Sequence, residues 1–544
     1  MKKITLCAIA VLLGLVSQAQ PVQKINEIMF KYGRFMYGLA ATYVDTVDID
    51  RLTESAIRKV LSELDPHSSY TSAKDAKAMT EPLQGNFEGV GIEFNILNDT
   101  LLVINPIAGG PSKKVGVLSG DRIVEVDGKN IAGVGLKNTE VAKHLRGPKG
   151  TEVHIKVARR GEMELLDFTI IRDKIPLYSI DAKFWAAPGV AYIKLNRFSN
   201  TSQTEFARAL KELGKKPEGI ILDLRGNSGG VYETSILLAD EFLKKGELIV
   251  YAEGRAMPRM DAIATDTLSK FEKGKLIVLI DEQSASASEI VAGAIQDWDR
   301  GLLVGRRTFG KGLVQNQSEL PDGSVVRITV ARYHTPSGRV IQRPYENGKA
   351  DKYQEDMYKR YASGELYSAD SVKQLPDSLQ YYTLHNKRVV YGGGGIVPDV
   401  FVPIDTSSYT KYHARLVRRG ILNQFTLRYS DAHRKQLMKE YTSLEKFKEK
   451  YVITDTLFNE LVSFAETQKL PKDSAEIAKA KFDISAQLKG LIAQDLFTTS
   501  AYYEVVFPQI DNGYQKAVEM MASWKKYEPL LESKIEPKAK SKKK

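Results

Sequence analysis

The sequence predicts a multidomain α+β protein in four parts: an N-terminal helical segment, a β-rich module, an α/β core and a helical C-terminal extension. Three observations carry this prediction. The 544 residues exceed what one hydrophobic core usually holds. Apolar residues make up 43% and charged residues 27%, which is typical of folded globular protein. The hydrophobic periodicity changes along the chain, from helical spacing to short strands, then to alternating strands and helices, and back to helix.

The first residues, MKKITLCAIAVLLGLVSQAQ, have the pattern of an export signal. Lys2 and Lys3 precede the apolar stretch Ile4–Val16, and Ser17 and Ala19 supply the small residues that a signal peptidase requires. We therefore predict a signal peptide over residues 1–19 and a periplasmic mature protein. The alternative is an uncleaved membrane anchor, for which this apolar stretch is short.

Cysteine and charge exclude several classes of function. The single cysteine, Cys7, lies in the predicted signal, so the mature protein would have no disulfide, thiolate nucleophile or Cys-bound metal. The net charge of +11 is partly due to the tail KIEPKAKSKKK, which carries six lysines and one glutamate. We interpret the tail as a solvated extension that can touch anionic membrane surfaces. No nucleic-acid motif accompanies the charge, so no nucleic-acid partner is expected.

Residues 20–83 are predicted to be an N-terminal helical segment, in which the helix DIDRLTESAIRKVLSEL ends in the proline-containing turn LDPHSSY. Residues 84–173 contain short strands such as GVGIEFNI, LLVINPI, DRIVEVDG and TEVHIKVAR, with one helix near Thr139 to Leu145. This succession of short strands predicts a small β-rich module.

Residues 174–405 alternate buried strands with helices, which predicts an α/β core. The polar, Tyr-rich stretch 346–395 is interpreted as an insertion or long loop, after which IVPDVFVP could complete the core sheet. Residues 406–544 are predicted to be helical, with the basic tail at the end. Such an extension could cover the sheet, mediate self-association or dock an adaptor, and the sequence does not choose between these.

The stretch LIVLIDEQSASASEIVAGAIQDW places three serines where a buried strand gives way to a helix. Free amides at a helix N-terminus favour negative charge, and the oxyanion of acyl transfer needs such donors. Ser286 and Glu289 also have the spacing of a capping box, which alone would explain the serine.

A serine nucleophile needs a base, and the sequence shows neither G-x-S-x-G nor a compact Ser-His-Asp signature. In TFGKGLVQ, burial of Lys311 would lower its pKa and let the neutral amine accept the serine proton, with Gln315 orienting it. The alternative is a surface lysine in a glycine turn. LDLRGNSGG forms either an ordinary turn or an oxyanion-binding one, and the amides of GVGI could capture a peptide carboxylate. No metal-binding or dinucleotide motif is present, so no cofactor is expected.

Together these blocks resemble the carboxy-terminal processing peptidases, or tail-specific proteases. They occur in the family's order: LDPHSSY, then GVGI, LSGDRIVEVDGKNI and LRGPKGT of a PDZ-like segment, then LDLRGNSGG, SASASEIVAGAIQD, GRRTFGKGLVQ and GGIVPDVFVP. The resemblance covers about residues 30–405. It implies a PDZ domain over 84–173 and a crotonase-like serine protease core over 174–405.

The resemblance also implies roles for individual residues. Ser286 would be the nucleophile, Lys311 the base and Gln315 its support, with Ser284 and Ser288 structural. The amides of Ala287 and Gly229 would form the oxyanion hole. The groups that would bind the substrate's C-terminal carboxylate are Val90, Gly91, Ile92 and Arg146, the last of which could equally be a surface arginine.

The sequence therefore predicts an exported serine endopeptidase that binds exposed C-terminal tails of proteins or peptides. Two rivals stay open. One is a non-catalytic PDZ scaffold or carrier of small apolar ligands on the same fold. The other is a Ser-His hydrolase that uses His334 of ARYHTPSG in place of the lysine.

Overall fold

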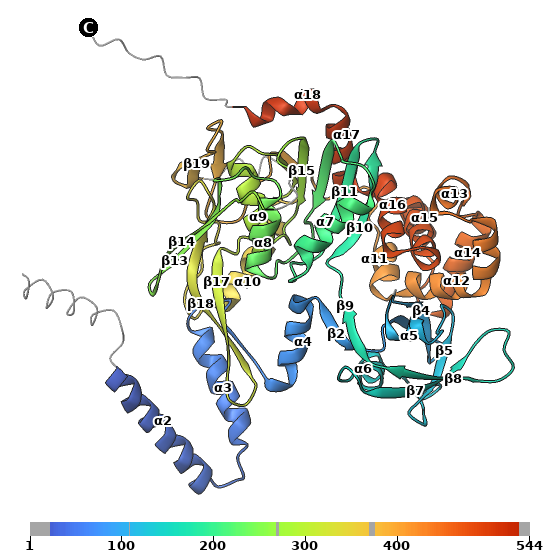
Figure 1. The fold of residues 1–544 in the computed structure, drawn as a ribbon, viewed down its shortest axis with the longest axis horizontal. Coiled ribbons are helices and arrows are strands. Elements are labelled where there is room, and N and C mark those ends of the chain that lie inside the picture. Colours follow the sequence, from blue (N-terminus) through green and yellow to red (C-terminus); the bar gives the residue numbers. More distant parts are fainter. Residues whose placement is uncertain (1–21, 108, 268–270, 369–375, 533–544) are drawn as a thin grey trace, which may run out of the picture.

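The structure is a computed structural model that describes residues 22–107, 109–267, 271–368 and 376–532 (Figure 1). The predicted signal peptide, with Cys7, and the lysine tail lie outside these residues. The multidomain α+β class is confirmed. Within the described residues, no helix has both the length and the apolar character needed to cross a membrane.

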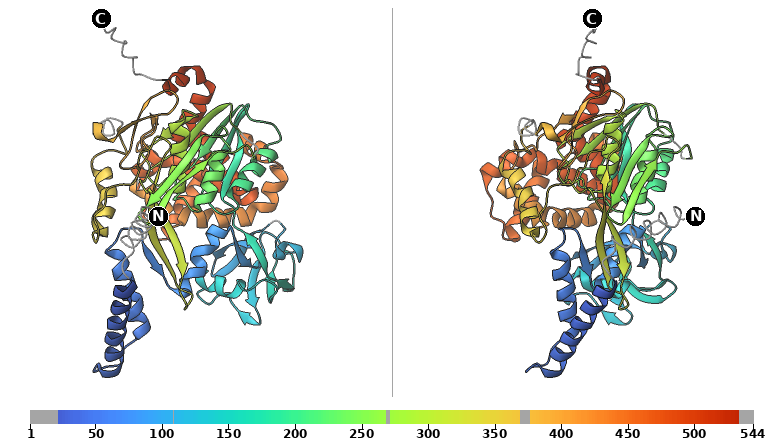
Figure 2. Two further views of the ribbon diagram at one scale, coloured as in Figure 1. Left: turned by 60° about the vertical axis from the view of Figure 1, so that its left-hand side comes forward. Right: turned by 90° about the vertical axis from the view of Figure 1, so that its left-hand side faces the viewer.

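The N-terminal segment consists of α2 (Val22–Thr42), α3 (Ile49–Ser62), β1 (Ser69–Thr71) and α4 (Ala73–Gln84). Helix α3 begins where the Asp48 side chain accepts the Arg51 amide at 2.9 Å. Helix α2 projects away from the rest of the molecule, as both views of Figure 2 show. The LDPHSSY turn leads into β1, which pairs antiparallel with a strand of the core and so brings this turn to the core.

The β-rich module is an antiparallel sheet in the order β3-β4-β5-β7-β8, with β6 beside β5. Alternate side chains of β7 (Val153, Ile155 and Val157) are buried, as period-two patterning requires. The two-stranded pair β2–β9 joins the module to the core. The bounds are β2 Asn86–Gly89, β3 Ile92–Leu97, β4 Thr100–Pro106, α5 Pro111–Lys114, β5 Arg122–Val126, β6 Lys129–Asn130, α6 Asn138–Leu145, β7 Glu152–Ala158, β8 Leu166–Ile171 and β9 Asp173–Pro176.

The core is built on a sheet in the order β10-β11-β12-β15-β16-β21, parallel except for the edge strand β10. The predicted strand at 396–403 completes it as β21, beside β16. Helices α7, α8 and α9 cover one face, where Leu222 and Val278 are fully buried. The bounds are β10 Ile180–Ala187, β11 Val190–Leu195, α7 Ser202–Glu212, β12 Gly219–Asp223, α8 Tyr232–Asp240, β15 Lys275–Ile280, α9 Ala287–Asp297, β16 Leu302–Gly305 and β21 Val400–Phe401.

A second sheet, in the order β1-β18-β13-β14 with β17 beside β18, extends from the core. The stretch 346–395 is more ordered than a long loop, because it includes α10 and a short hairpin, β19–β20, and α10 buries Tyr353. The bounds are β13 Leu248–Gly254, β14 Met257–Ile263, β17 Leu313–Glu319, β18 Val325–His334, α10 Ala350–Ala362, η2 Asp377–Leu379, β19 Gln380–Tyr382 and β20 Val389–Tyr391.

The C-terminal helical region covers the other face of the core sheet. Tyr514, Met520 and Met521 pack in one buried cluster with Ile221 and Ile277 of the strands. The region also lies against the β-rich module (Figure 1), where α12 contacts β3. The bounds are α11 Lys411–Arg418, α12 Ile421–Glu440, α13 Leu444–Lys450, α14 Asp455–Thr467, α15 Ser474–Leu496, α16 Thr499–Ile510, α17 Asn512–Ala522, α18 Trp524–Tyr527 and η3 Glu528–Leu531.

Ion pairs fix this contact between the module and the helical region. Arg122 donates to the carboxylate of Asp431 at 2.6 Å, and Arg160 donates to the Asp431 carbonyl at 2.9 Å. The extension therefore joins the module to the core. It also covers the core sheet, which is one of the roles the sequence left open.

Candidate active site

Ser286 is the N-cap residue of α9, at the end of the segment that follows β15. Its backbone has φ +54° and ψ −112°, a conformation that residues other than glycine rarely adopt. Ser286 and Glu289 form the predicted capping box, in which the Glu289 carboxylate accepts the Ser286 amide at 2.9 Å. Strain of this kind persists only when the surroundings enforce it, and it is concentrated at functional sites.

The structure distinguishes the three serines. The Ser284 hydroxyl donates to the Leu224 carbonyl and the Ser288 hydroxyl to the Asn227 carbonyl, each at 2.8 Å. Both side chains are fully buried, whereas Ser286 is only half-buried. The outer serines therefore attach the helix to the LDLRGNSGG segment, and Ser286 remains accessible to a reactant.

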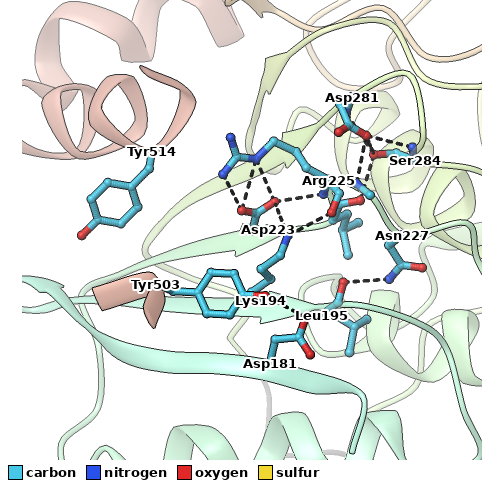
Figure 3. Close-up of polar contacts among 12 residues, drawn as sticks. Asp181, Lys194, Leu195, Asp223, Arg225, Asn227, Asp281, Ser284, Tyr503 and Tyr514 are labelled. Carbon is cyan, nitrogen blue, oxygen red and sulfur yellow. Dashed lines mark hydrogen bonds and ion pairs between the residues drawn. The ribbon is translucent and has the colours of Figure 1, made fainter. Parts of the chain in front are cut away.

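The turn Gly226–Gly230 lies against Ser286. A Cβ atom at Gly229, where φ is +101°, would stand 2.9 Å from the Ser286 Cβ and 3.0 Å from the Ala287 nitrogen, so only glycine fits there. The turn is fixed by Asn227, whose side chain donates to the Leu195 carbonyl at 2.9 Å (Figure 3).

The two amides predicted for an oxyanion hole differ in this structure. The Gly229 amide donates to the side-chain oxygen Oδ1 of Asn227, two residues earlier, at 2.9 Å. For the amides of Ala287 and Gly230, the described part of the chain provides no hydrogen-bond acceptor. In this conformation Ala287 is therefore an available donor, and Gly229 becomes one only if it leaves Asn227. The assignment of the oxyanion hole stays a prediction.

Lys311 lies between β16 and β17, and the structure brings it together with Gln315. Its ammonium Nζ donates to Gln315 Oε1 at 3.1 Å. Burial lowers the pKa of Lys311 below its ordinary value, and the charge of Arg327 lowers it further. The Gln315 amide nitrogen in turn donates to the His67 carbonyl, so the oxygen end of Gln315 must face the lysine.

Two buried side chains join the backbone of Ser286 to that of Lys311. The Glu289 carboxylate accepts both amides, Ser286 at 2.9 Å and Lys311 at 2.8 Å. The Tyr333 hydroxyl contacts both carbonyls, at 3.1 Å for Ser286. The backbone segments of the serine and the lysine are thus linked by two shared side chains.

Glu289 makes two more contacts on its other oxygen, from the Thr308 hydroxyl at 2.6 Å and the Gly310 amide at 2.7 Å. Burial raises the pKa of Glu289 to about 7, although four hydrogen bonds oppose the rise by favouring the carboxylate. The sequence suggested Glu289 only as a helix cap, because its contacts to the glycine-rich loop depend on the tertiary fold.

A ring of contacts that sequence reasoning missed supports the lysine. The His67 ring contacts the Tyr353 hydroxyl at 3.0 Å, and the same hydroxyl receives the Gln342 amide at 3.2 Å. Gln342 accepts the Gly312 amide at 2.9 Å, next to Lys311. Burial and the charge of Lys311 lower the pKa of His67 to about 4. The LDPHSSY motif was the available signal, but its position beside Gln315 follows only from the β1–β18 pairing.

His334, the base of the rival hydrolase, lies elsewhere. Its ring stacks on Tyr251 at 4.5 Å and contacts the Gly338 carbonyl at 3.2 Å. None of its hydrogen bonds within the described residues reaches Ser286. The contacts through Glu289 and Tyr333 link the backbone of Lys311 to that of Ser286, so Lys311 remains the predicted base.

Several parts of the chain are similar to known proteins. Residues 189–348 match the model of peptidase family S41, residues 89–170 match a PDZ domain, and residues 412–498 match a family of unknown function, DUF8443. A carboxy-terminal-processing protease of Bartonella bacilliformis is 38% identical over 342 residues, which is 60% of this chain and 77% of that protein. The chain belongs to the carboxy-terminal-processing protease family.

Other members have similar coverage. The carboxy-terminal processing protease CtpA of Bacillus subtilis is 33% identical and is matched over 62% of this chain and 73% of its own length. A solved structure named photosystem II D1 C-terminal processing protease is 30% identical, with a TM-score of 0.33, over 56% of this chain and 83% of its own. The S41 match, the PDZ match and the related proteases show that the chain is a serine-type protease with a PDZ domain.

The PDZ domain of this protease has a groove between β3 and α6. The groove, of about 260 Å³, is lined by all four residues predicted to bind a carboxylate: Val90, Gly91, Ile92 and Arg146. Arg146 lies beside the aromatic ring of Phe87, at 4.7 Å, and its guanidinium pairs with the buried carboxylate of Glu81 at 2.6 Å. The arginine is therefore already neutralised by a residue of the N-terminal segment.

Proposed function

We propose that the protein is an exported serine endopeptidase that captures C-terminal tails in its PDZ groove and cleaves the chain with Ser286 and Lys311. The observation that carries the proposal is the shared support of these two residues by Glu289 and Tyr333, beside a lysine whose pKa is lowered by burial. Membership of the protease family supports the same conclusion.

The reaction uses the neutral form of Lys311. Its Nζ accepts the proton of Ser286 Oγ as that oxygen attacks the carbonyl carbon of the peptide bond. Gln315 holds one N–H of the amine, which leaves the lone pair for the serine proton. The developing oxyanion receives the Ala287 amide and a second amide from the Gly226–Gly230 turn. Lys311 then gives the proton to the leaving amine, and water repeats the sequence on the acyl-enzyme.

Recognition of the tail would occur in the PDZ groove. Apolar side chains such as Val90 and Ile92 line the groove, which favours an apolar last residue. A PDZ domain binds an extended peptide as an added strand and holds its terminal carboxylate with backbone amides. The substrate class is therefore proteins or peptides with an exposed, apolar C-terminus.

The test uses two peptides that differ only in a free or an amidated C-terminus, with the wild type and Ser286→Ala. We expect the wild type to cleave the free-acid peptide with kcat/KM at least about tenfold higher than the amide, because the amide lacks the charge that the groove amides bind. Ser286→Ala should bind the free-acid peptide with unchanged Kd and cleave neither. A wild type that binds but never cleaves would support the scaffold alternative.

Export is part of the proposal and rests on the N-terminal pattern. Lys2 and Lys3, the apolar stretch and the small residues at 17 and 19 predict cleavage after Ala19. The mature protein, expressed from the full gene in a bacterium and recovered by osmotic shock, is expected to begin at Gln20 by intact mass. Recovery of the protein in the cytosolic fraction with Met1 retained would show that this part is wrong.

A further inference from the structure

A buried cluster of charges lies directly beneath the turn that touches Ser286. Asp223 ends β12 with a fully buried side chain, and Arg225 donates to it at 2.6 Å (Figure 3). Lys194 of β11 stands 3.7 Å from the same carboxylate and donates to the Arg225 carbonyl at 2.9 Å. The next residue along the chain after Arg225 is Gly226, the first of the turn.

The fourth charge of this cluster comes from the C-terminal helical region. Asp511, between α16 and α17, accepts Arg225 at 2.8 and 3.1 Å through its two oxygens. The same carboxylate caps α17 by accepting the Tyr514 amide at 2.6 Å. Among the ion pairs of the described residues, Arg225 and Lys194 share the core carboxylate of Asp223, and Asp511 supplies Arg225 with a second carboxylate.

The region is shaped to reach this arginine. A Cβ atom at Gly513 would stand 2.7 Å from the Arg225 guanidinium, so glycine lets the first turn of α17 approach. The Phe507 ring lies 5.5 Å from the same guanidinium. Apolar packing of Tyr514, Met520 and Met521 already covers the sheet, so this costly buried ion pair is not needed for coverage.

Hydrogen bonds hold the turn that follows Arg225, so a displacement of Arg225 would also displace the turn. The Gly226 amide donates to Asp281 at 3.0 Å. The Asn227 carbonyl accepts the Ala285 amide at 3.0 Å and the Ser288 hydroxyl at 2.8 Å, so the turn and the serine segment are one hydrogen-bonded unit. A shift of Arg225 would therefore be transmitted to the turn and, through these bonds, to the segment that carries Ser286.

We propose that Asp511 is a positioning residue for this site: through Arg225 it holds the Gly226–Gly230 turn against Ser286. The C-terminal helical region, of which residues 412–498 match a family of unknown function, thereby becomes part of the catalytic unit. This inference rests on the proposed function, because it concerns the turn that serves the serine.

The experiment compares the full-length wild type with Asp511→Asn, which keeps the shape and removes the charge. We expect kcat for the tail peptide to fall about 10- to 100-fold with KM within about twofold, since misplacing oxyanion donors costs this much. Labelling of Ser286 by a serine-reactive phosphonate, followed by intact mass, should slow in parallel. Asp455→Asn, in the same region and exposed beside Lys481, is the matched control and should resemble the wild type.

Further variants separate positioning from simple loss of folding. All rates are measured well below each variant's Tm. Arg225→Gln with Asp511→Asn should lose no more activity than Arg225→Gln alone, because the aspartate acts through the arginine, and Asp511→Glu should recover part of the loss. Gly513→Ala keeps every charge but displaces the Arg225 guanidinium, so it should also lower kcat. This variant tests the inference if Asp511→Asn does not fold.

The outcomes are distinct. A kcat within twofold of the wild type in folded Asp511→Asn, or in Gly513→Ala where the first does not fold, overturns the inference. A wild type that cleaves no peptide overturns the proposed function, while the rate of phosphonate labelling still shows whether Asp511 acts on Ser286. A wild type that is neither active nor labelled overturns both.

Discussion

Lys311→Ala is expected to lower kcat for a tail peptide by about four orders of magnitude, close to the loss in Ser286→Ala. Without the amine, the described residues offer no other base in contact with Ser286, because His334 stacks on Tyr251 and contacts the Gly338 carbonyl. The double variant should lose no more than either single one, since residues that act as a unit are non-additive. Steady-state cleavage and the rate of phosphonate labelling of Ser286 check this expectation.

Lys311→Arg tests whether the base must be a neutral amine. The guanidinium keeps a positive charge and N–H donors for Gln315, but it cannot lose its proton in the accessible pH range. It is therefore expected to be as inactive as alanine, with a Tm close to that of the wild type. Lys215→Ala, on the exposed loop after α7, is the control and should leave kcat unchanged. Activity retained in Lys311→Arg would exclude the neutral lysine as the base.

The sequence could predict the serine site because its signals are local. A strand, a run of small residues and an apolar helix follow one another within LIVLIDEQSASASEIVAGAIQDW, and the resemblance to a protease family selected Ser286. The burial of Ser284 and Ser288 against the Leu224 and Asn227 carbonyls gives that choice a physical basis. No local pattern distinguishes the three hydroxyls.

The rest depends on contacts between distant parts of the chain. Asp511 reaches Arg225, and Gln315 reaches His67, across hundreds of residues, and neither pair has a periodicity or a spacing that could reveal it. From the sequence, the stretch 346–395 is interpreted as an insertion or long loop because it is polar and Tyr-rich. Helix α10 lies in it but buries only a few side chains, such as Tyr353, so the sequence shows little apolar periodicity there. The occupied Gly229 amide was also unforeseen, since an Asn two residues earlier could equally have faced solvent.

Glu289→Gln is expected to lower kcat by about 100-fold or more, because the change puts an NH₂ group where only acceptors fit. Each Glu289 oxygen receives two donors, among them the fixed amides of Ser286 and Lys311. Whichever way the glutamine amide turns, its nitrogen faces two of these donors, and a buried unsatisfied donor costs about 1–3 kcal/mol. Thermal unfolding should show a lowered Tm, and Glu460→Gln, exposed on α14, should match the wild type.

The pH dependence of the wild type gives this prediction its specific signature. Burial raises the pKa of Glu289 to about 7 from an ordinary 4.5, so over that interval the folded state binds more protons than the unfolded state. The free energy of unfolding should therefore fall as pH rises from about 4.5 to 7. Activity should rise over the same interval, because only the carboxylate accepts all four donors, and should rise again at higher pH as Lys311 loses its proton below its ordinary pKa of 10.5. In Glu289→Gln, the changes in stability and in activity between about pH 4.5 and 7 should disappear, while the rise in activity at higher pH, due to Lys311, should remain. If the changes between about pH 4.5 and 7 persist in the variant, they belong to another group and Glu289 does not have this role.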